Sequence, residues 1–400
     1  MAGNTKKTSK AKKKLQPADI QGCKYFKLIP ELLESLHDIG TQRDTAGNRK
    51  FFFDQYVALQ LLYFFSPVVT SLNGLREATD LKKVQKLLGI KRVSMGTLSE
   101  SATVFDAEPL RKIIQNLAQK AVPLHSGREA DALQNLTAVD GSILSALPRM
   151  MWALWKDETH RGVKLHLHFD VFAGVPRQAT VTKAACSETA ELKATLEPNR
   201  LYVNDRGYQD QSLFKEIIDF GSSFIIRVKD NIAYEVQEER EITTDAKAAG
   251  VIRDVVLSRF GSSRRKNVLL QPVRLVIVQA TKKDGTPYEI WLITDRLEMD
   301  ADLIAIGYRY RWTVELFFRW FKQILGMQHL ISDKENGVTI QLYVAMIASL
   351  LIVLWTGLKV NKRTWEMLQH YLIGWATLEE FEHHIRKQLE KQERQLKKAK

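Results

Sequence analysis

Apolar residues recur at spacings of three and four positions from about residue 25 to residue 125. The pattern is clearest in segments 51–65 and 109–122, and it places apolar side chains along one face of a helix. Residues 75–105 are predicted to form short helices between these two segments. The first third of the chain is therefore predicted to be helical.

After residue 130 the apolar positions form short continuous runs, which are typical of buried strands. Strands are predicted at 136–140, 163–171, 178–184, 200–205 and 222–229, and helices at 187–196 and 211–220. Three strands followed by helix, strand, helix and strand predict an α/β fold, in which flanking helices cover a mixed sheet.

Residues 231–297 differ from their surroundings, because strand patterns follow one another there without long helical segments. A hairpin turn is expected at Asp284 and Gly285, between the last two of three strands at 251–260, 272–280 and 288–295. Helical spacing resumes near Asp300, a plausible N-cap, and continues through residue 322. We interpret residues 231–297 as a β-rich insertion.

The most apolar run of the chain covers residues 340–355. It is shorter than the roughly 20 apolar residues that a membrane span needs, and it contains Gln341 and Ser349. We predict a helix buried on all sides in a protein core, and no membrane segment.

A charged helix is expected over 377–400. It has too few apolar positions for a heptad seam, so it could either pack against a partner helix or form a solvated tail.

The net charge of +13, from 59 Lys and Arg against 46 Asp and Glu, indicates affinity for a polyanion, although a soluble basic protein also fits. Residues 1–20 are lysine-rich and lack the apolar core of a signal peptide. They fit either a disordered arm on DNA phosphates or a solubilising tail.

The two cysteines, Cys23 and Cys186, form no CxxC pair, which fits a reducing cytoplasm.

Two carboxylates stand at the predicted carboxyl ends of strands, where active sites of sheet-based folds collect. Asp140 ends one strand and is followed by Gly-Ser, and Asp205 ends another and is followed by Arg-Gly-Tyr. Each of them alone is equally typical of a turn. His166 and His168 share one strand face, but no third ligand stands nearby, so we interpret them as structural rather than metal-binding.

A third carboxylate lies in the predicted helix over 308–322. At about 100° per residue, its polar side chains fall within one arc of roughly 80°: Tyr308, Arg311, Glu315, Arg319 and Lys322. The remaining large side chains point toward a core: Phe317, Trp320 and Phe321. The polar stripe fits either a solvated face held by ion pairs or a functional surface.

Together, Asp140, Asp205 and Glu315 have the chemistry to hold divalent metal ions, because Mg²⁺ prefers carboxylate and phosphate oxygens. Two such ions about 3.5–4 Å apart can activate an attacking oxygen and stabilise a leaving one during phosphoryl transfer. Arg311, Lys322 and the Tyr308 hydroxyl would then hold substrate phosphates.

These residues resemble a known family. Tyr308, Arg311, Glu315 and Lys322 match the spaced signature of bacterial insertion-sequence transposases, which have a ribonuclease-H-like domain and a DDE triad. The segment AVDGS around Asp140 resembles the family's first Asp block, and NDRGY around Asp205 resembles its second. Members of this group carry a β-rich insertion before the Glu, where residues 231–297 stand.

The resemblance implies a cut-and-paste transposase that binds terminal inverted repeats, nicks DNA, forms and opens a hairpin end, and joins it to target DNA. It implies two Mg²⁺ ions, replaceable by Mn²⁺, on Asp140, Asp205 and Glu315. It also implies DNA contacts by four stripe residues and by a base-stacking Trp: Tyr308, Arg311, Arg319, Lys322 and Trp291. The alternative is that Trp291 is a strand residue packed within the insertion. The resemblance further implies a homodimer in the synaptic complex and a bacterial cytoplasmic, nucleoid-associated location.

The predicted organisation has four parts. They are a disordered basic arm (1–20), a helical DNA-binding domain (21–125), a ribonuclease-H-like catalytic domain (126–345) and C-terminal helices that could dimerise (346–400). The helical domain carries a basic surface that suits either DNA-end binding or a plain helical cap: Lys82, Lys83, Lys86, Lys91 and Arg92. Two other functions stay open, namely a ribonuclease-H-like nuclease without strand transfer and an inactive DNA-binding derivative.

Overall fold

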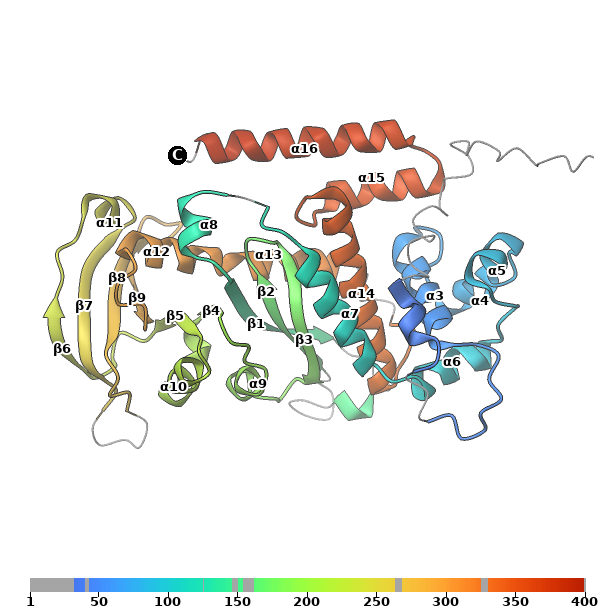
Figure 1. Cartoon of the computed structure of the whole chain (residues 1–400), viewed down its shortest axis with the longest axis horizontal. Coiled ribbons are helices and arrows are strands. Elements are labelled where there is room, and N and C mark those ends of the chain that lie inside the picture. Colours follow the sequence, from blue (N-terminus) through green and yellow to red (C-terminus); the bar gives the residue numbers. More distant parts are fainter. Residues whose placement is uncertain are drawn as a thin grey trace, which may run out of the picture.

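The structure is a computed structural model that describes residues 32–39, 43–124, 126–145, 150–153, 162–262, 268–324 and 330–398. The predicted basic arm and Cys23 lie outside these residues. A sheet of nine strands, in the order β3-β2-β1-β4-β5-β9-β8-β7-β6, runs through the middle of the molecule. Figure 1 shows helices of the N-terminal region gathered beyond one end of this sheet and the insertion at the other.

Five strands form the first part of the sheet: β1 (Leu136–Ser145), β2 (Gly162–Asp170), β3 (Val175–Lys183), β4 (Leu201–Asn204) and β5 (Ser223–Val228). β1, β2 and β3 pair antiparallel in sequence order, whereas β4 lies parallel to both β1 and β5. Helices α9 (Glu188–Ala194) and α10 (Gln211–Asp219) make the crossovers on either side of β4. This is the mixed, ribonuclease-H-like sheet expected from the sequence.

The insertion continues the same sheet. It contains β6 (Tyr234–Glu239), α11 (Thr244–Ala248), β7 (Val251–Phe260), β8 (Val273–Thr281) and β9 (Pro287–Thr294). β9 returns to pair antiparallel with β5, with Val228 opposite Trp291. The three predicted strands are confirmed, but β6 and α11 were not predicted. β6 has an almost entirely exposed, glutamate-rich sequence, so it lacks the apolar alternation that marks a half-buried strand.

A buried ion pair fixes the insertion to the segment before the next helix. The guanidinium of Arg274 donates to both oxygens of Asp254, at 2.7 and 2.6 Å, and both side chains are almost fully buried. The same guanidinium also donates to the carbonyls of Leu297 and Met299. These bonds satisfy a charge that would otherwise be costly to bury, so β7 and β8 are held to the chain that leads into α12.

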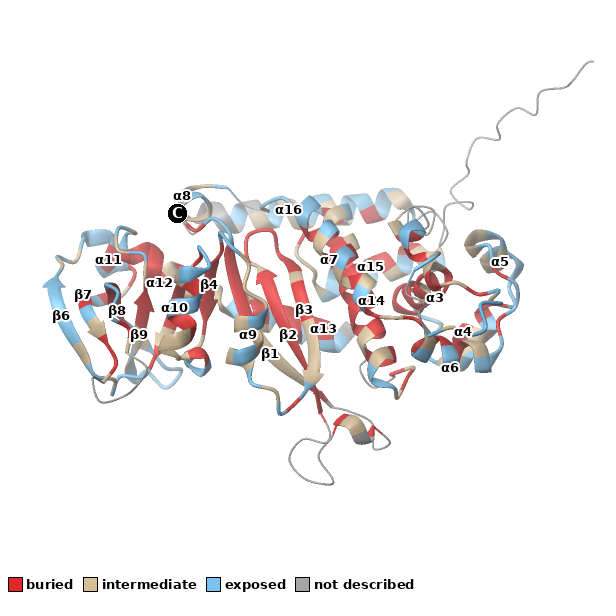
Figure 2. Cartoon of the chain, turned by 60° about the horizontal axis from the view of Figure 1, so that its bottom comes forward, coloured by how far each residue is buried: buried red, intermediate tan, exposed pale blue. Residues whose placement is uncertain are grey.

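Helices of the N-terminal region pack beside the sheet. They are η2 (Glu34–Leu36), α3 (Phe53–Phe65), α4 (Leu72–Ala78), α5 (Lys82–Leu88), α6 (Met95–Val104), α7 (Glu108–Lys120) and α8 (Arg128–Ala132). One hydrophobic core joins this region to the sheet, and Figure 2 shows buried residues running from the central strands into α14 and α3. The division at residue 125 thus crosses a shared core, and the domain boundaries stay predictions.

The apolar run near residue 350 forms α14 (Glu335–Thr356), which packs against α3, α6, α7 and β3. Among the described helices, α14 alone has the length and apolar composition to cross a membrane, and 83% of its most apolar stretch is buried inside the protein. The predicted buried core helix is therefore confirmed.

The last two described helices are α15 (Lys362–Ile373) and α16 (Leu378–Lys398), and α16 lies along one long side of the molecule (Figure 1).

The single helix predicted through residues 308–322 is two helices, α12 (Ala301–Tyr310) and α13 (Trp312–Ile324), separated by Arg311. The backbone N–H groups of Arg311 and Val314 each bond to a carbonyl three residues earlier, so the helix tightens locally into a 3₁₀-type turn. Asp300 occupies the N-cap position, but its carboxylate pairs with Arg128 at 2.8 Å instead of capping.

The two strand histidines are structural, as predicted. His166 and His168 are buried on β2, and their Nε2 atoms lie 2.9 and 3.1 Å from the hydroxyls of Thr182 and Thr195. Burial lowers the pKa of His166 to about 4 and that of His168 to about 3, so both rings are neutral at physiological pH.

Candidate active site

Asp140 lies in the middle of β1, not at its end as predicted. Gly141 and Ser142 look like a turn in the sequence, but they continue the strand because β1 pairs with β2 as far as Ser145. The parallel pairing of β1 with β4 stops earlier, at Ala138 opposite Val203. Asp140 therefore stands where β1 extends past its parallel neighbour, and its side chain is only partly covered.

Asp205 follows the last residue of β4, as predicted. It lies two residues beyond Val203, just as Asp140 lies two residues beyond Ala138, so the strand register brings the two aspartates side by side. The Asp205 carboxylate caps the short 3₁₀ helix η4 (Arg206–Tyr208) by accepting the Gly207 N–H at 2.8 Å. This cap fixes the chain directly after the strand.

The neighbourhood of Asp140 carries an excess of negative charge. Burial is the main cause that raises the pKa of Asp140 to about 7, and the nearby carboxylates of Asp205 and Glu188 contribute to the rise. The Gly141 N–H, which donates to Asp140 Oδ1 at 2.8 Å, and the Arg311 guanidinium oppose this shift without cancelling it. A bound cation would relieve the repulsion, which is what a metal site requires.

Glu315 projects from α13, which packs against β1. Its carboxylate accepts from the Arg311 guanidinium at 2.5 Å, one helical turn back along the chain. Arg311 also lies 5.9 Å from the centre of the Tyr308 ring and close enough to Asp205 for their charges to interact. This i,i+4 ion pair is of the kind expected for a solvated helix face, and it gives Glu315 a guanidinium as its partner.

The three carboxylates do not form a finished metal site. Within the described residues, no three His, Cys, Asp or Glu side chains lie close enough to hold one ion. Asp140 and Asp205 adjoin each other, and Glu315 is paired with Arg311. The donor set, all carboxylate oxygen, fits a hard divalent cation once Glu315 leaves its partner.

The other stripe residues differ in how they lie relative to this centre. Partial burial lowers the pKa of Lys322, whereas the negative charge of Asp140 raises it, so the ammonium faces the carboxylate centre. Burial raises the pKa of Tyr308, and the nearby guanidinium groups of Arg311 and Arg227 oppose this rise. Arg319 instead lies over the Trp312 ring, at 6.0 Å from its centre. The aromatic residues predicted to face the core are buried: Phe317, Trp320 and Phe321.

Trp291 lies on β9 and has partners within the insertion. Its indole N–H donates to Glu289 at 2.8 Å, and its ring meets the Tyr234 ring edge-on at 5.9 Å. The ring is only partly buried. Both interpretations of Trp291 stay open on this geometry, because a partly exposed aromatic face can pack in the insertion and can also receive a base.

The structure adds a residue that sequence analysis missed. Glu188, the first residue of α9, lies against the backbone of Gly141, where an added Cβ would stand 2.8 Å from its carboxylate. The carboxylate pairs with Lys164 at 3.3 Å and lies near the buried Tyr208 of η4, whose pKa is raised by burial and by the charge of Glu188. No motif spacing marks Glu188, because it meets the aspartates only through the α9 crossover.

Comparisons with known proteins place the chain in a family. A family model described as "Transposase DDE domain" matches residues 131–351. The chain is similar to a probable transposase for insertion sequence element IS5377 of Geobacillus stearothermophilus, with 24% identity over 294 residues, 73% of this chain and 75% of the relative. A cryo-EM structure of a piggyBac transposase synaptic complex with hairpin DNA aligns with a TM-score of 0.44 and 12% identity, covering 92% of this chain and 82% of that one.

Proposed function

The chain belongs to the DDE transposase family, and we propose that Asp140, Asp205 and Glu315 are its catalytic carboxylates. The protein is a DNA transposase, an enzyme that cleaves DNA and transfers strands. One observation supports the residue assignment: the β1–β4 register sets Asp140 beside Asp205, and burial together with the neighbouring carboxylates raises the pKa of Asp140 to about 7.

DDE transposases use divalent metal ions, and the proposed site would take two Mg²⁺, or Mn²⁺ in their place. Bound there, the ions would activate the attacking oxygen and stabilise the leaving oxygen of a phosphodiester. Asp140 and Asp205 would hold the ions from the rigid edge of the sheet. Glu315 would join them from α13 after it leaves Arg311, which then becomes free to hold a substrate phosphate.

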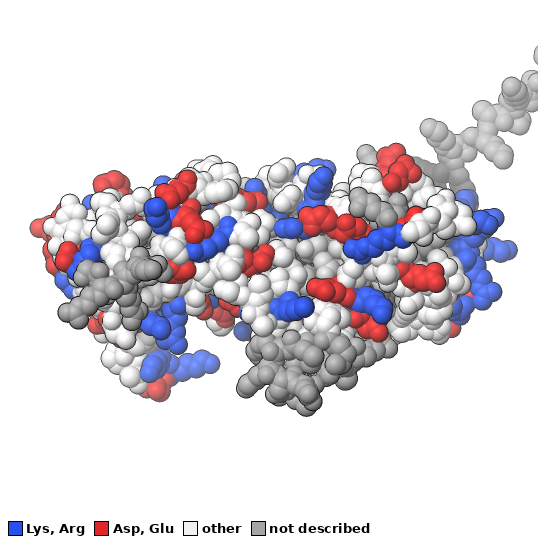
Figure 3. Space-filling view, turned by 90° about the horizontal axis from the view of Figure 1, so that it is seen from below, with Lys and Arg blue, Asp and Glu red and all other residues white. Residues whose placement is uncertain are grey.

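The cations around the carboxylates support a DNA-bound state. We assign phosphate contacts to Tyr308, Arg311, Arg319 and Lys322, all in or next to α12 and α13. The N-terminal region offers a further basic surface on α5 and the following loop, and Figure 3 shows Lys and Arg gathered at that end of the molecule. Lys82, Lys83 and Lys86 are exposed there and form no ion pair with described residues. We propose that this surface binds the DNA of the terminal inverted repeats.

The finer steps belong to the same proposal. The enzyme would nick the element's end, form a hairpin, open it and join it to target DNA within a synaptic homodimer in the bacterial nucleoid. Trp291 would stack on a base extruded at the hairpin, since such stacking contributes about 1–3 kcal/mol. Its partly exposed ring at the β5–β9 junction supports this role.

Cleavage and joining of a terminal-repeat substrate test the assignment. Asp140→Ala, Asp205→Ala and Glu315→Ala should each abolish Mg²⁺-dependent cleavage while the protein still binds DNA. Asp219→Ala is the matched control, because Asp219 is an exposed aspartate on α10 that pairs only with Lys215 among the described residues. Unchanged cleavage by Asp205→Ala would refute the triad.

Two alternatives are separable in the same assay. A nuclease without strand transfer would cleave the substrate but fail to join a pre-cut end to target DNA. An inactive DNA-binding derivative would bind the ends and cleave nothing, with or without the substitutions.

A further inference from the structure

Asn204, the last residue of β4, is fully buried directly before Asp205. Its side-chain amide donates to the carbonyl of Val139, the residue before Asp140, at 3.2 Å. One side chain thus joins the two strand residues that precede the two aspartates. The proposed chemistry of the carboxylates does not use this residue.

The bond from Asn204 continues the pairing of β1 with β4 past its last backbone pair. Backbone pairing of these parallel strands stops at Ala138 opposite Val203. One residue further along each strand, the Val139 carbonyl accepts from the Asn204 side chain. The two strands are therefore still joined at the residues directly before the aspartates.

The Asn204 side chain lies on the face of the sheet opposite to the two carboxylates. Successive side chains along a strand point to alternate faces. Ala138 and Val203 belong to the core that includes the buried side of α13, whereas Val139 and Tyr202 belong to the core beside α9 and α10. The aspartates, two residues beyond Ala138 and Val203, therefore face α13. Asn204 supports them from the other face without being a candidate ligand itself.

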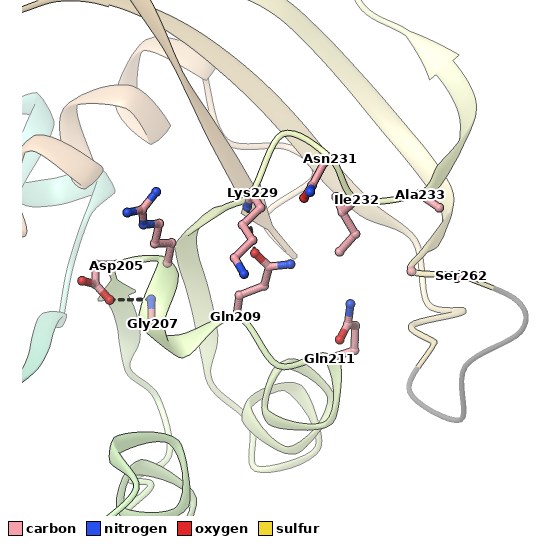
Figure 4. Close-up of a pocket in the computed structure, with 11 residues that line it drawn as sticks. Asp205, Gly207, Gln209, Gln211, Lys229, Asn231, Ile232, Ala233 and Ser262 are labelled. Atoms are coloured by element: carbon pink, nitrogen blue, oxygen red, sulfur yellow. Dashed lines mark hydrogen bonds between the residues drawn. The ribbon is translucent and has the colours of Figure 1, made fainter. Parts of the chain in front are cut away.

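The separation of β1 and β4 at this point matters for ion binding. Neighbouring strands lie about 4.8 Å apart, which is close to the spacing of about 3.5–4 Å between two paired metal ions. On the side of the insertion, Asp205 borders an open cavity of about 1290 Å³, where open space rather than packed side chains lies against it. The bond from the Gly207 N–H to Asp205 in Figure 4 lies within one turn and does not reach β1. The Asn204 amide does reach β1.

The buried amide of Asn204 also has a cost that an apolar residue would avoid. Its Oδ1 atom is buried and accepts no hydrogen bond within the described part of the chain. An unsatisfied buried acceptor destabilises a fold, and an apolar side chain of similar shape would remove it. The donor to Val139 therefore explains this asparagine better than packing does.

We propose that Asn204 is a positioning residue for the catalytic carboxylates. Its amide holds β4 to β1 as far as the aspartates, and so fixes the separation of Asp140 and Asp205 before an ion binds. This role rests on the proposed function, because it takes both aspartates as metal ligands. Removing a group that orients metal ligands typically lowers metal affinity about 10–100-fold, so the loss of this one bond should cost about tenfold.

Titration of the full-length protein with Mn²⁺, followed by the electron paramagnetic resonance signal of the free ion, tests this role. Asn204→Leu keeps a side chain of similar size without the donor, and it should weaken Mn²⁺ binding about tenfold. Urea unfolding in EDTA should give a stability close to wild type, because the unsatisfied Oδ1 is lost together with the bond to Val139. Half-maximal cleavage of a terminal-repeat substrate should need about tenfold more Mg²⁺.

Thr137→Val is the matched control on β1. Thr137 is buried, and its hydroxyl donates to the Asn135 carbonyl at 2.9 Å, so the substitution also removes a side-chain bond to a carbonyl from this strand. It should leave Mn²⁺ affinity unchanged. Asn204→Ala removes the same donor as Asn204→Leu without adding bulk, and it replaces the leucine variant if that variant does not fold.

Wild-type Mn²⁺ affinity in a folded Asn204 variant, or an equal loss in Thr137→Val, would overturn the positioning role. Asp205→Ala in the same titration separates this result from failure of the proposed function. If Asp205→Ala binds Mn²⁺ as wild type does, the assignment of the carboxylates is wrong, and the role of Asn204 falls with it. If Asp205→Ala loses Mn²⁺ while the Asn204 variants keep it, only the positioning role is wrong.

Discussion

Arg311 donates to Glu315 at 2.5 Å, so the third carboxylate of the proposed triad is paired with a guanidinium. Both side chains are partly buried, at 17% and 30% exposure, so the pair is more than a surface contact. The negative charge of Asp205 also acts on this guanidinium and favours its charged form. Under the proposed function, a metal ion would replace Arg311 as the partner of Glu315, and a DNA phosphate would replace Glu315 as the partner of Arg311.

Arg311→Ala should change the affinities for metal and DNA in opposite directions. Without its partner, Glu315 is free to join Asp140 and Asp205, so Mn²⁺ affinity in the absence of DNA should rise a few-fold. Affinity for DNA ends should fall about tenfold, because a charged phosphate contact is lost. Mn²⁺ titration by electron paramagnetic resonance and DNA binding by fluorescence anisotropy measure the two effects. Arg319→Ala should leave Mn²⁺ affinity unchanged, and a similar rise in that control would contradict the mechanism.

The stability of the metal-free protein should depend on pH through Asp140. Its pKa is raised from 3.8 to about 7 in the folded state, so the folded protein holds a proton that the unfolded chain has released. The free energy of unfolding therefore falls as pH rises from about 4 to about 7. Asp140→Asn removes this cost and should be more stable than wild type at pH 8 by on the order of 2–4 kcal/mol.

Urea unfolding in EDTA at pH 4.5 and pH 8 measures this difference. The stabilisation by Asp140→Asn should largely disappear at the lower pH, where Asp140 is protonated in the wild type. Asp219→Asn, at an exposed site, should show no such pH dependence. An equal effect of Asp140→Asn at both pH values would mean that the raised pKa is not the cause.

Glu188 and Tyr208 should act as one unit that holds the Asp205 turn against β1. Glu188→Ala removes the carboxylate that lies near the buried Tyr208 hydroxyl and should cost about 1–3 kcal/mol. In a Tyr208→Phe background the same substitution should cost much less, because the hydroxyl is already gone. A double-mutant cycle by chemical unfolding measures the coupling. Additive costs would show that the pair does not interact, and Glu191→Ala on the same helix is the control.

Trp291→Ala should impair hairpin formation more than the first nick, since only the hairpin step is proposed to need an extruded base. Trp291→Phe should recover part of the loss, because phenylalanine retains an aromatic face. Gel assays that resolve nicked and hairpin products measure the two steps. Equal losses in both steps would instead indicate that Trp291 packs the insertion through Tyr234 and Glu289.

The sequence predicted the parts of the fold that depend on local pattern. The spacing of Tyr308, Arg311, Glu315 and Lys322 predicted a polar stripe, and the buried face of α13 followed from the helical period. Asp140 was misplaced at a strand end because the choice between turn and strand at Gly141 depends on pairing with β2. Glu188 and the cavity beside Asp205 depend on crossovers and on the return of β9 to β5, which no local pattern records.

The pairing of β5 with β9 limits how this enzyme can be shortened. Residues 231–297 resemble an appendage that could be cut away to give a minimal catalytic core. Their removal would strip the partner from Ile225–Val228 and leave an apolar strand edge bare in water. Such an edge recruits strands from other molecules, so a trimmed enzyme would aggregate unless its new edge were also redesigned with charge or proline.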